Sequence, residues 1–355
     1  MRRMRTWTVG VLAMLGGCTE SKVSQDQDVV LSGRLLDESG TPLSGTLLNV
    51  YRSDNSSCGF TIFSSSWRTV KTGADGTFRM DLLGADTRNG SIARCFVARS
   101  PTQKEGRSVA AYFLIQQPDS ALPALQEWTG TLTSTVEAQG VSVGFRPLSA
   151  THGAGTDEHS LTIGPSLVEP VWQVAKAASP VHLSDYVLED MDGLKASIHV
   201  TRTAKVGSET VDYTYSSDLL ALPRRARVPV SRGATCAYQD AKAPCAITDG
   251  GLGGLVLFAP GVRDVSLQLA RPAVLRKAVL RSFEISGTLT EVVLEGSADG
   301  TQWVPLVNLL AGAGVQRFME VDLSGTTAVS QVRLRAATKD ATAGLRSLGQ
   351  LSVFE

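Results

Sequence analysis

The sequence is poor in aromatic residues, in histidine and in net charge. Phe, Trp and Tyr make up 6% of its 355 residues, there are four histidines, and 34 basic side chains balance 34 acidic ones. Without a basic run beyond the extreme N-terminus, a surface that binds nucleic acid is not expected. At 43% hydrophobic and 19% charged, the chain is too apolar and too weakly charged to be intrinsically disordered.

Enzyme motifs are also scarce. The sequence has no H-E-x-x-H zinc motif and no Walker A lysine loop, and its histidines all lie between residues 152 and 199. We therefore predict no catalytic residues and no enzyme. The acidic cluster of Glu189, Asp190 and Asp192 could hold the carboxylate pair of a glycosidase, so a hydrolase is the remote alternative.

The N-terminus has the pattern of an export signal. Three arginines among the first five residues precede Thr6–Leu15, whose roughly ten apolar positions are too few for a membrane span of about 20. The following Leu15-Gly16-Gly17-Cys18 resembles the lipobox of bacterial lipoproteins. This resemblance implies a signal peptide at residues 1–17 and lipid on Cys18, and Thr19 favours the bacterial outer membrane. A secretory signal with a chance cysteine is the alternative.

Four cysteines remain if Cys18 carries lipid: Cys58, Cys95, Cys236 and Cys245. An even number in an oxidising compartment predicts two disulfides, and three pairings are open. We prefer Cys58–Cys95 and Cys236–Cys245, because each pair lies within one predicted domain. A zinc site is disfavoured, since the cysteines lack the close paired spacing of zinc ligands.

After a polar tether at residues 18–27, the chain reads as strands and turns, and we predict an all-β fold of tandem β-sandwiches. Residues 28–116 contain G-x-L-x-D-x-x-G-x-P-L-x-G and then T-x-x-D-G-x-F, in which Asp75-Gly76 is a tight-turn dipeptide. This succession resembles the carboxypeptidase regulatory-like domain. The resemblance implies a transthyretin-like sandwich that serves as a spacer.

Residues 117–225 are the least informative part. Val141, Val143 and Phe145 alternate, and spaced strands with a buried Trp fit an immunoglobulin- or fibronectin-like sandwich. The loop from Ser149 to Ser160 contains His152 and His159. A solvated loop is preferred there over a metal site.

Residues 226–355 have a more specific pattern. The element S-A-D-G-T-Q-W, residues 297–303, is followed by the alternating V-R-L of residues 332–334 and a terminal strand. This order resembles the discoidin (coagulation factor 5/8 type C) family, which implies a galactose-binding-like jelly roll at the C-terminal end of the fold. We predict a hairpin turn at Asp299-Gly300 and a core position for Trp303, with a platform on which a sugar stacks as the alternative for this tryptophan.

By the same resemblance, ligands are bound by loops at one end of the jelly roll. The matching candidates lie in the loop closed by the second disulfide: Tyr238, Gln239, Asp240 and Lys242. An aromatic face with amide or charged tips can stack on a sugar and bond to it, and an ordinary exposed loop is the alternative. Some relatives hold a structural calcium, but Gln350 stands where Glu is common. We predict no metal and no cofactor, with calcium as the disfavoured alternative.

The sequence thus predicts a non-catalytic, lipid-anchored protein of the bacterial outer membrane that binds carbohydrate or another surface ligand through its C-terminal jelly roll. Its partners would be the membrane, through the lipid anchor, and a glycan or an envelope protein. The alternative is a structural or protein-interaction lipoprotein with no small-molecule ligand.

Overall fold

The computed structural model describes residues 19–54, 56, 58, 66–101, 107–149, 152–165, 170–206, 209–238, 241–250, 255–311 and 314–355. In these residues the predicted all-β class is confirmed. The helical elements among them are short, namely the α-helix α1 (Asp185–Leu188) and the 3-10 helix η1 (Gly84–Thr87). No described helix is long and apolar enough to cross a bilayer.

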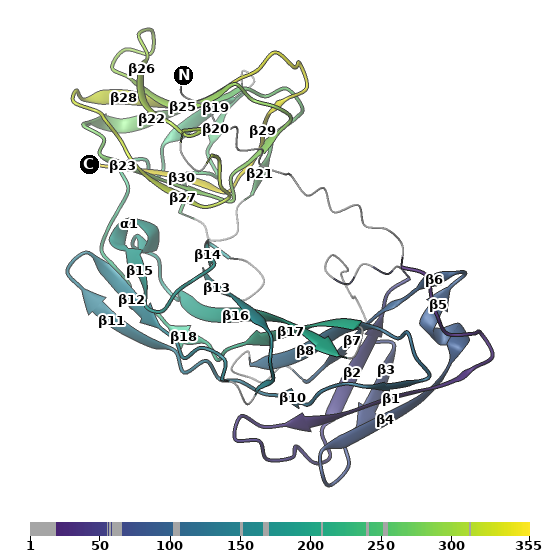
Figure 1. Ribbon diagram of the computed structural model, residues 1–355. Coiled ribbons are helices and arrows are strands. Elements are labelled where there is room, and N and C mark those ends of the chain that lie inside the picture. Colours follow the sequence, from purple (N-terminus) through teal and green to yellow (C-terminus); the bar gives the residue numbers. More distant parts are fainter. Residues whose placement is uncertain are drawn as a thin grey trace, which may run out of the picture.

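One long antiparallel sheet runs through the first two thirds of the chain. Its order is β14 (Trp172–Ala175), β13 (Thr156–Gly164), β16 (Lys195–Val206), β17 (Glu209–Ser216), β8 (Ser108–Leu114), β7 (Cys95–Arg99), β2 (Leu47–Arg52) and β3 (Arg68–Lys71), with β18 (Leu220–Ala221) also paired to β16. Figure 1 shows it as a curved band along the molecule. Because β8 pairs with β17, the sheet continues across the boundary predicted at residue 116.

Two smaller sheets pack against this long sheet. The first contains β1 (Asp28–Leu36), β4 (Thr77–Leu83), β9 (Asp119–Ala121) and β10 (Leu125–Gln126), and the second contains β11 (Thr133–Glu137), β12 (Gly140–Gly144) and β15 (Val181–Ser184). A further hairpin is formed by β5 (Arg88–Asn89) and β6 (Ile92–Ala93). Inward residues from both sheets join those of the long sheet in one core cluster. We call these two sandwiches, which share a sheet and a core, the first and the middle unit.

The turn before β4 shows how the local sequence sets a strand. The Asp75 carboxylate accepts hydrogen bonds from the backbone N–H and the hydroxyl of Thr77, as expected for an Asx turn. Phe78, Met80 and Leu82 then alternate into the core with exposed residues between them. The predicted turn is confirmed, and the alternating strand follows it directly.

Residues 226–355 form a two-layered C-terminal unit. One layer is a six-stranded sheet of β20 (Ala241–Pro244), β19 (Thr235–Tyr238), β22 (Asp264–Ala273), β28 (Val329–Ala337), β25 (Glu291–Ser297) and β26 (Val304–Asn308). The other contains β21 (Val256–Leu257), β29 (Gly344–Leu348) and β24 (Glu284–Ser286), beside β27 (Met319–Asp322), β23 (Lys277–Arg281) and β30 (Gln350–Phe354). The two layers enclose a second hydrophobic core, so the predicted terminal sandwich is confirmed.

The C-terminal unit packs on the middle unit through the layer that contains β23 and β30 (Figure 1). Val279, Phe318 and Phe354 all belong to the core cluster of the first two units. The ring of Phe354 meets Tyr186 of α1 edge-on at 5.0 Å, and Phe318 lies 5.9 Å from Trp172 of β14. The two hydrophobic cores are therefore joined by an apolar contact.

A buried ion-pair network crosses the same contact. Glu189, which directly follows α1, is fully buried, and its carboxylate accepts from Arg281 at 2.7 Å and from Arg232 at 3.0 Å. Arg281 also donates to the carbonyl of Val187 and to the side chain of Gln350. Burial lowers the pKa of the Arg281 guanidinium, although the carboxylate beside it acts in the opposite direction. This network joins the C-terminal unit to the segment around α1.

Both preferred disulfides are present. Cys58–Cys95 links the segment after β2 to β7, and Cys236–Cys245 closes the β19–β20 hairpin. Loop entropy predicts contributions of about 4 and about 3 kcal/mol, respectively. Each bridge lies within one unit, so neither fixes the contact between the units.

We predict that Glu189→Ala lowers the free energy of unfolding by about 3–5 kcal/mol, because it leaves Arg281 buried without its counter-charge. Urea denaturation followed by circular dichroism measures the change. Asp192→Ala is the matched control: this carboxylate is 72% exposed and pairs with an exposed Arg224, so its loss should cost less than about 1 kcal/mol. Equal effects of the two substitutions would contradict the structural role of Glu189.

Candidate functional site

The outer face of the six-stranded sheet carries a row of polar side chains. Thr235 of β19 lies opposite Gln268 of β22, and Gln268 lies opposite Gln331 of β28. Thr235 and Gln268 are exposed and Gln331 is partly buried. Because side chains directly opposite each other on paired strands lie about 5 Å apart, the three form a continuous polar strip across the sheet.

This strip lines a shallow groove of about 210 Å³. Ser266, one pleat further along β22, lines it too, and its hydroxyl lies 3.4 Å from the carbonyl of Ala237. Gln268 donates its amide N–H to the carbonyl of Ser330. We call the groove defined by Thr235, Ser266, Gln268 and Gln331 the outer-face groove. Hydroxyl and amide groups give it both donors and acceptors, without a formal charge.

The arginines beside the groove are paired with carboxylates. Arg333 donates to Glu295 on the neighbouring strand at 2.8 Å, and Arg335 donates to Glu295 and to Glu291. Glu295 is buried, with 6% of its side chain exposed. This ladder neutralises the cations of β28, so the outer face does not present a free anion-binding patch there.

Trp303 lies on this outer face, and its predicted core position is wrong. The residue is partly exposed, and the guanidinium of Arg333 stands over its ring, 4.2 Å from the centroid. Trp303 precedes β26 and lies outside the alternating segment, so the strand pattern did not specify its face. A cation–π contact holds the indole beside the groove.

The predicted hairpin turn at Asp299–Gly300 is present between the paired strands β25 and β26. The Asp299 carboxylate accepts hydrogen bonds from the backbone N–H groups of Gln302 and Thr301, at 2.9 and 2.8 Å. These two hydrogen bonds hold the pKa of Asp299 well below its usual range, and the one from Gln302 has the larger effect. Gly300 has φ +79°, and a Cβ there would lie 2.7 Å from the Nε2 atom of Gln331. The turn therefore packs directly against the groove.

The loop residues expected to bind a ligand are only partly described. Tyr238 ends β19 and packs edge-on against Phe258, with 5.6 Å between ring centroids, at the margin of the second core. Lys242 lies in β20, opposite Ala237. Gln239 and Asp240 lie outside the described residues, as does Cys18. The structure thus places Tyr238 in a packing contact near one end of the groove.

The acidic cluster proposed for a hydrolase forms ion pairs. Glu189 belongs to the buried network with Arg281, and Asp190 accepts from Arg232 at 2.7 Å. Asp192 accepts from Arg224 at 2.9 Å. The contacts of Glu189 and Asp190 join the middle unit to the C-terminal unit, that of Asp192 lies within the middle unit, and all three carboxylates are paired with cations.

Sequence reasoning missed one match to the G-x-S-x-G spacing of hydrolase nucleophiles, Gly140–Gly144. The segment forms the strand β12, whereas a nucleophile elbow needs a sharp strand-to-helix turn. The Ser142 hydroxyl donates to Glu137, whose other oxygen lies 3.1 Å from Nδ1 of His182. Since the carboxylate stands between serine and histidine, the histidine is not placed as the general base of a triad.

The interpretation of Ser149–Ser160 as a solvated loop is wrong for the segment from Thr156 onward, which belongs to β13. His159 lies within β13 and stacks on Phe145 at 5.3 Å. Asp157 accepts from Arg202 at 2.5 Å, with 6% of the arginine side chain exposed. In the part of the chain that the structure describes, no group of three or more His, Cys, Asp or Glu could hold a metal ion.

Comparisons with known proteins give limited likenesses. No protein-family model and no curated protein matches the chain. Among solved structures, the chitosan-binding module 1 of a Paenibacillus sp. IK-5 chitosanase/glucanase is 16% identical, covering 36% of this chain and 98% of the module, with a TM-score of 0.29. The module CpGH89CBM32-5 of Clostridium perfringens, solved with GalNAc-beta-1,3-galactose, is 14% identical over 36% of this chain and 99% of that module, with a TM-score of 0.28. At such scores neither likeness identifies a ligand for this chain.

We predict that Asp299→Ala lowers the midpoint of thermal unfolding at neutral pH, and that this difference disappears in acid. A carboxyl whose pKa is depressed in the folded state stabilises it above the ordinary aspartate pKa of about 3.9. The stabilisation is lost as the pH falls from there through the lower folded-state pKa. Thermal melts of both proteins from neutral to strongly acidic pH test this, and a difference independent of pH would contradict it.

Proposed function

We propose that this protein is a non-catalytic, lipid-anchored protein of a bacterial outer membrane, and that its C-terminal unit binds a neutral carbohydrate at the outer-face groove. The observation that carries the proposal is the uncharged polar strip of Thr235, Gln268 and Gln331. Trp303 stacks on Arg333, which lies opposite the groove residue Ser266. Sugar hydroxyls both donate and accept hydrogen bonds, as amide and hydroxyl side chains do.

The charges around the groove support a neutral ligand. Arg333 and Arg335 are already bonded to Glu295 and Glu291, so an anionic ligand would have to compete with built-in carboxylates. Trp303 adds apolar surface at the edge of the groove, where the apolar face of a sugar ring can pack. The groove has a volume of about 210 Å³, which suits one or two residues of a longer glycan.

The arrangement of the units supports display away from an anchor. The described chain begins beside the first unit, where Glu20 pairs with Ile92 of β6. The C-terminal unit packs on the middle unit through β23 and β30, so its six-stranded layer is the one turned away (Figure 1). A lipid on Cys18 would therefore attach at the first unit and leave the groove free.

We predict that Gln331→Ala weakens glycan binding about tenfold, because it removes hydrogen bonds worth about 1 kcal/mol or more. A glycan array with the full chain identifies the neutral ligand, and isothermal titration calorimetry measures both affinities. Gln173→Ala, an exposed glutamine on β14, is the control and should bind as the wild type does. No saturable binding to any neutral glycan, or unchanged affinity of Gln331→Ala, would disprove the proposal.

The anchor is tested separately. Cys18→Ala removes the thiol that would carry the lipid, so we expect the variant to appear in the soluble envelope fraction and the wild type in the membrane fraction. Fractionation with immunoblotting measures the distribution, and metabolic labelling with a palmitate analogue reports the lipid itself. Membrane association of the variant equal to that of the wild type would exclude this anchor.

A further inference from the structure

A second cavity, of about 610 Å³, lies where the first and the middle unit meet. The turn after β1 contributes Glu38, and Arg107 enters just before β8. The segment after β10 contributes Glu127 and Trp128, and the segment after β12 contributes Arg146. We call it the junction cavity. None of its lining residues belongs to the C-terminal unit, so it is separate from the outer-face groove.

The charged side chains of the junction cavity balance one another. Arg146 forms an ion pair with Glu38. The Nε atom of Arg107 lies 3.6 Å from Asp218 and 4.0 Å from Glu127, between two carboxylates. Both guanidinium groups are therefore paired with carboxylates of the protein, so a ligand that binds here need not carry a negative charge.

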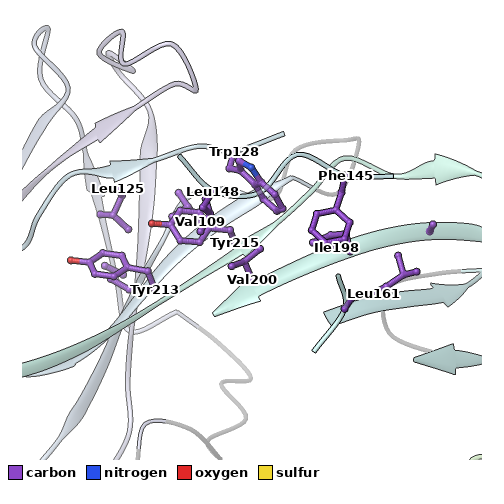
Figure 2. Packing of buried hydrophobic residues seen from close by; sticks show 14 of the residues in the cluster. Val109, Leu125, Trp128, Phe145, Leu148, Leu161, Ile198, Val200, Tyr213 and Tyr215 are labelled. Carbon is purple, nitrogen blue, oxygen red and sulfur yellow. The ribbon is translucent and has the colours of Figure 1, made fainter. Parts of the chain in front are cut away.

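Two buried N–H groups on the lining residues have no acceptor among the described residues. Trp128 is 1% exposed, and its indole Nε1 makes no hydrogen bond. The Nε of Arg107 also makes none, since the neighbouring carboxylates are beyond hydrogen-bond distance. Figure 2 shows Trp128 among the packed side chains of the shared core, between Leu125 and Phe145 in this view. Buried donors without an acceptor are rare and unfavourable, so their presence on one cavity calls for an acceptor within it.

His152 adds no charge to the cavity. Its Nε2 lies 3.1 Å from the backbone carbonyl of Glu127, and a carbonyl can only accept, so Nε2 carries the proton. Nδ1 then accepts from the Ser149 hydroxyl at 3.0 Å. Burial lowers the pKa of His152, which keeps the ring neutral.

We propose that the junction cavity binds a small, neutral, polyhydroxylated molecule, of the size of a mono- or disaccharide, with its oxygens on the N–H groups of Trp128 and Arg107. A hydroxyl can accept from these donors and donate to the Glu127 carboxylate at the same time. An anion would meet Glu127 and Glu38, and a simple cation would leave both N–H groups unpaired. The volume lies within the range of about 300–1,000 Å³ typical of small-molecule sites.

The indole N–H of Trp128 supplies a direct probe. The chain has five tryptophans, and the ¹⁵N–¹H signal of Trp128 is the one lost in Trp128→Phe. The full chain is titrated with glucose, galactose, N-acetylglucosamine, lactose and chitobiose. We expect at least one sugar to move this signal saturably and to raise the unfolding midpoint. Trp128→Phe keeps an aromatic side chain but lacks the N–H donor, so it should bind that sugar about fivefold more weakly.

Three comparisons complete the test. Trp128→Phe leaves a smaller side chain in the core, so its circular dichroism and cooperative unfolding without sugar are measured to show that the variant folds. Arg107→Lys, which keeps the charge but not the fixed Nε–H, should also weaken binding. Trp303→Phe should leave the Trp128 shift intact, which separates this cavity from the outer-face groove. The proposal fails if no sugar moves the signal, if Trp128→Phe binds equally well, or if glycine or phosphate moves the signal instead.

Discussion

The buried carboxylate of Glu189 is the interaction on which the arrangement of the whole molecule depends. Removing a carboxylate and a guanidinium from water is expensive, and only close contact with hydrogen bonds offsets that cost. Glu189 meets this condition in one docking position, in which Arg281 and Arg232 reach its two oxygens. The apolar contact of Phe354 with Tyr186 tolerates small shifts, whereas the ion pairs do not. Hydrophobic burial therefore supplies the attraction between the units, and the buried charges supply the orientation.

The shared sheet fixes the position of the first unit relative to the middle unit. Because β8 pairs with β17, the first and the middle unit cannot rotate against each other without breaking backbone hydrogen bonds. The junction cavity lies at this joint, where turns and segments next to the paired strands line it. The outer-face groove is lined by residues of the paired strands β19, β22 and β28, on the layer that faces away from the middle unit. The groove is thus preorganised by backbone hydrogen bonds, and little ordering is needed there when a ligand binds.

Local features of this fold were accessible from the sequence, and long-range features were not. The turns at Asp75 and Asp299 and the two disulfides depend on residues close in sequence or on simple pairing rules. The shared sheet, by contrast, depends on pairing across more than ninety residues, and no local pattern encodes that register. For the outer-face groove, the alternation of Val332 and Leu334 in the sequence already implies that Gln331, which lies next to Val332, faces outward. Its proximity to Thr235 required the register of three strands.

The equal numbers of basic and acidic side chains in the sequence correspond to ion pairs in the structure. Basic and acidic side chains are matched in number in the sequence, and in the structure arginines meet carboxylates at the outer face, in the junction cavity and between the units. Charges used in this way are not available for steering an ionic partner. What remains at the groove and in the cavity are amides, hydroxyls and N–H groups, beside two tryptophans. Such groups discriminate by hydrogen-bond geometry and shape, which is the basis on which neutral sugars are distinguished from one another.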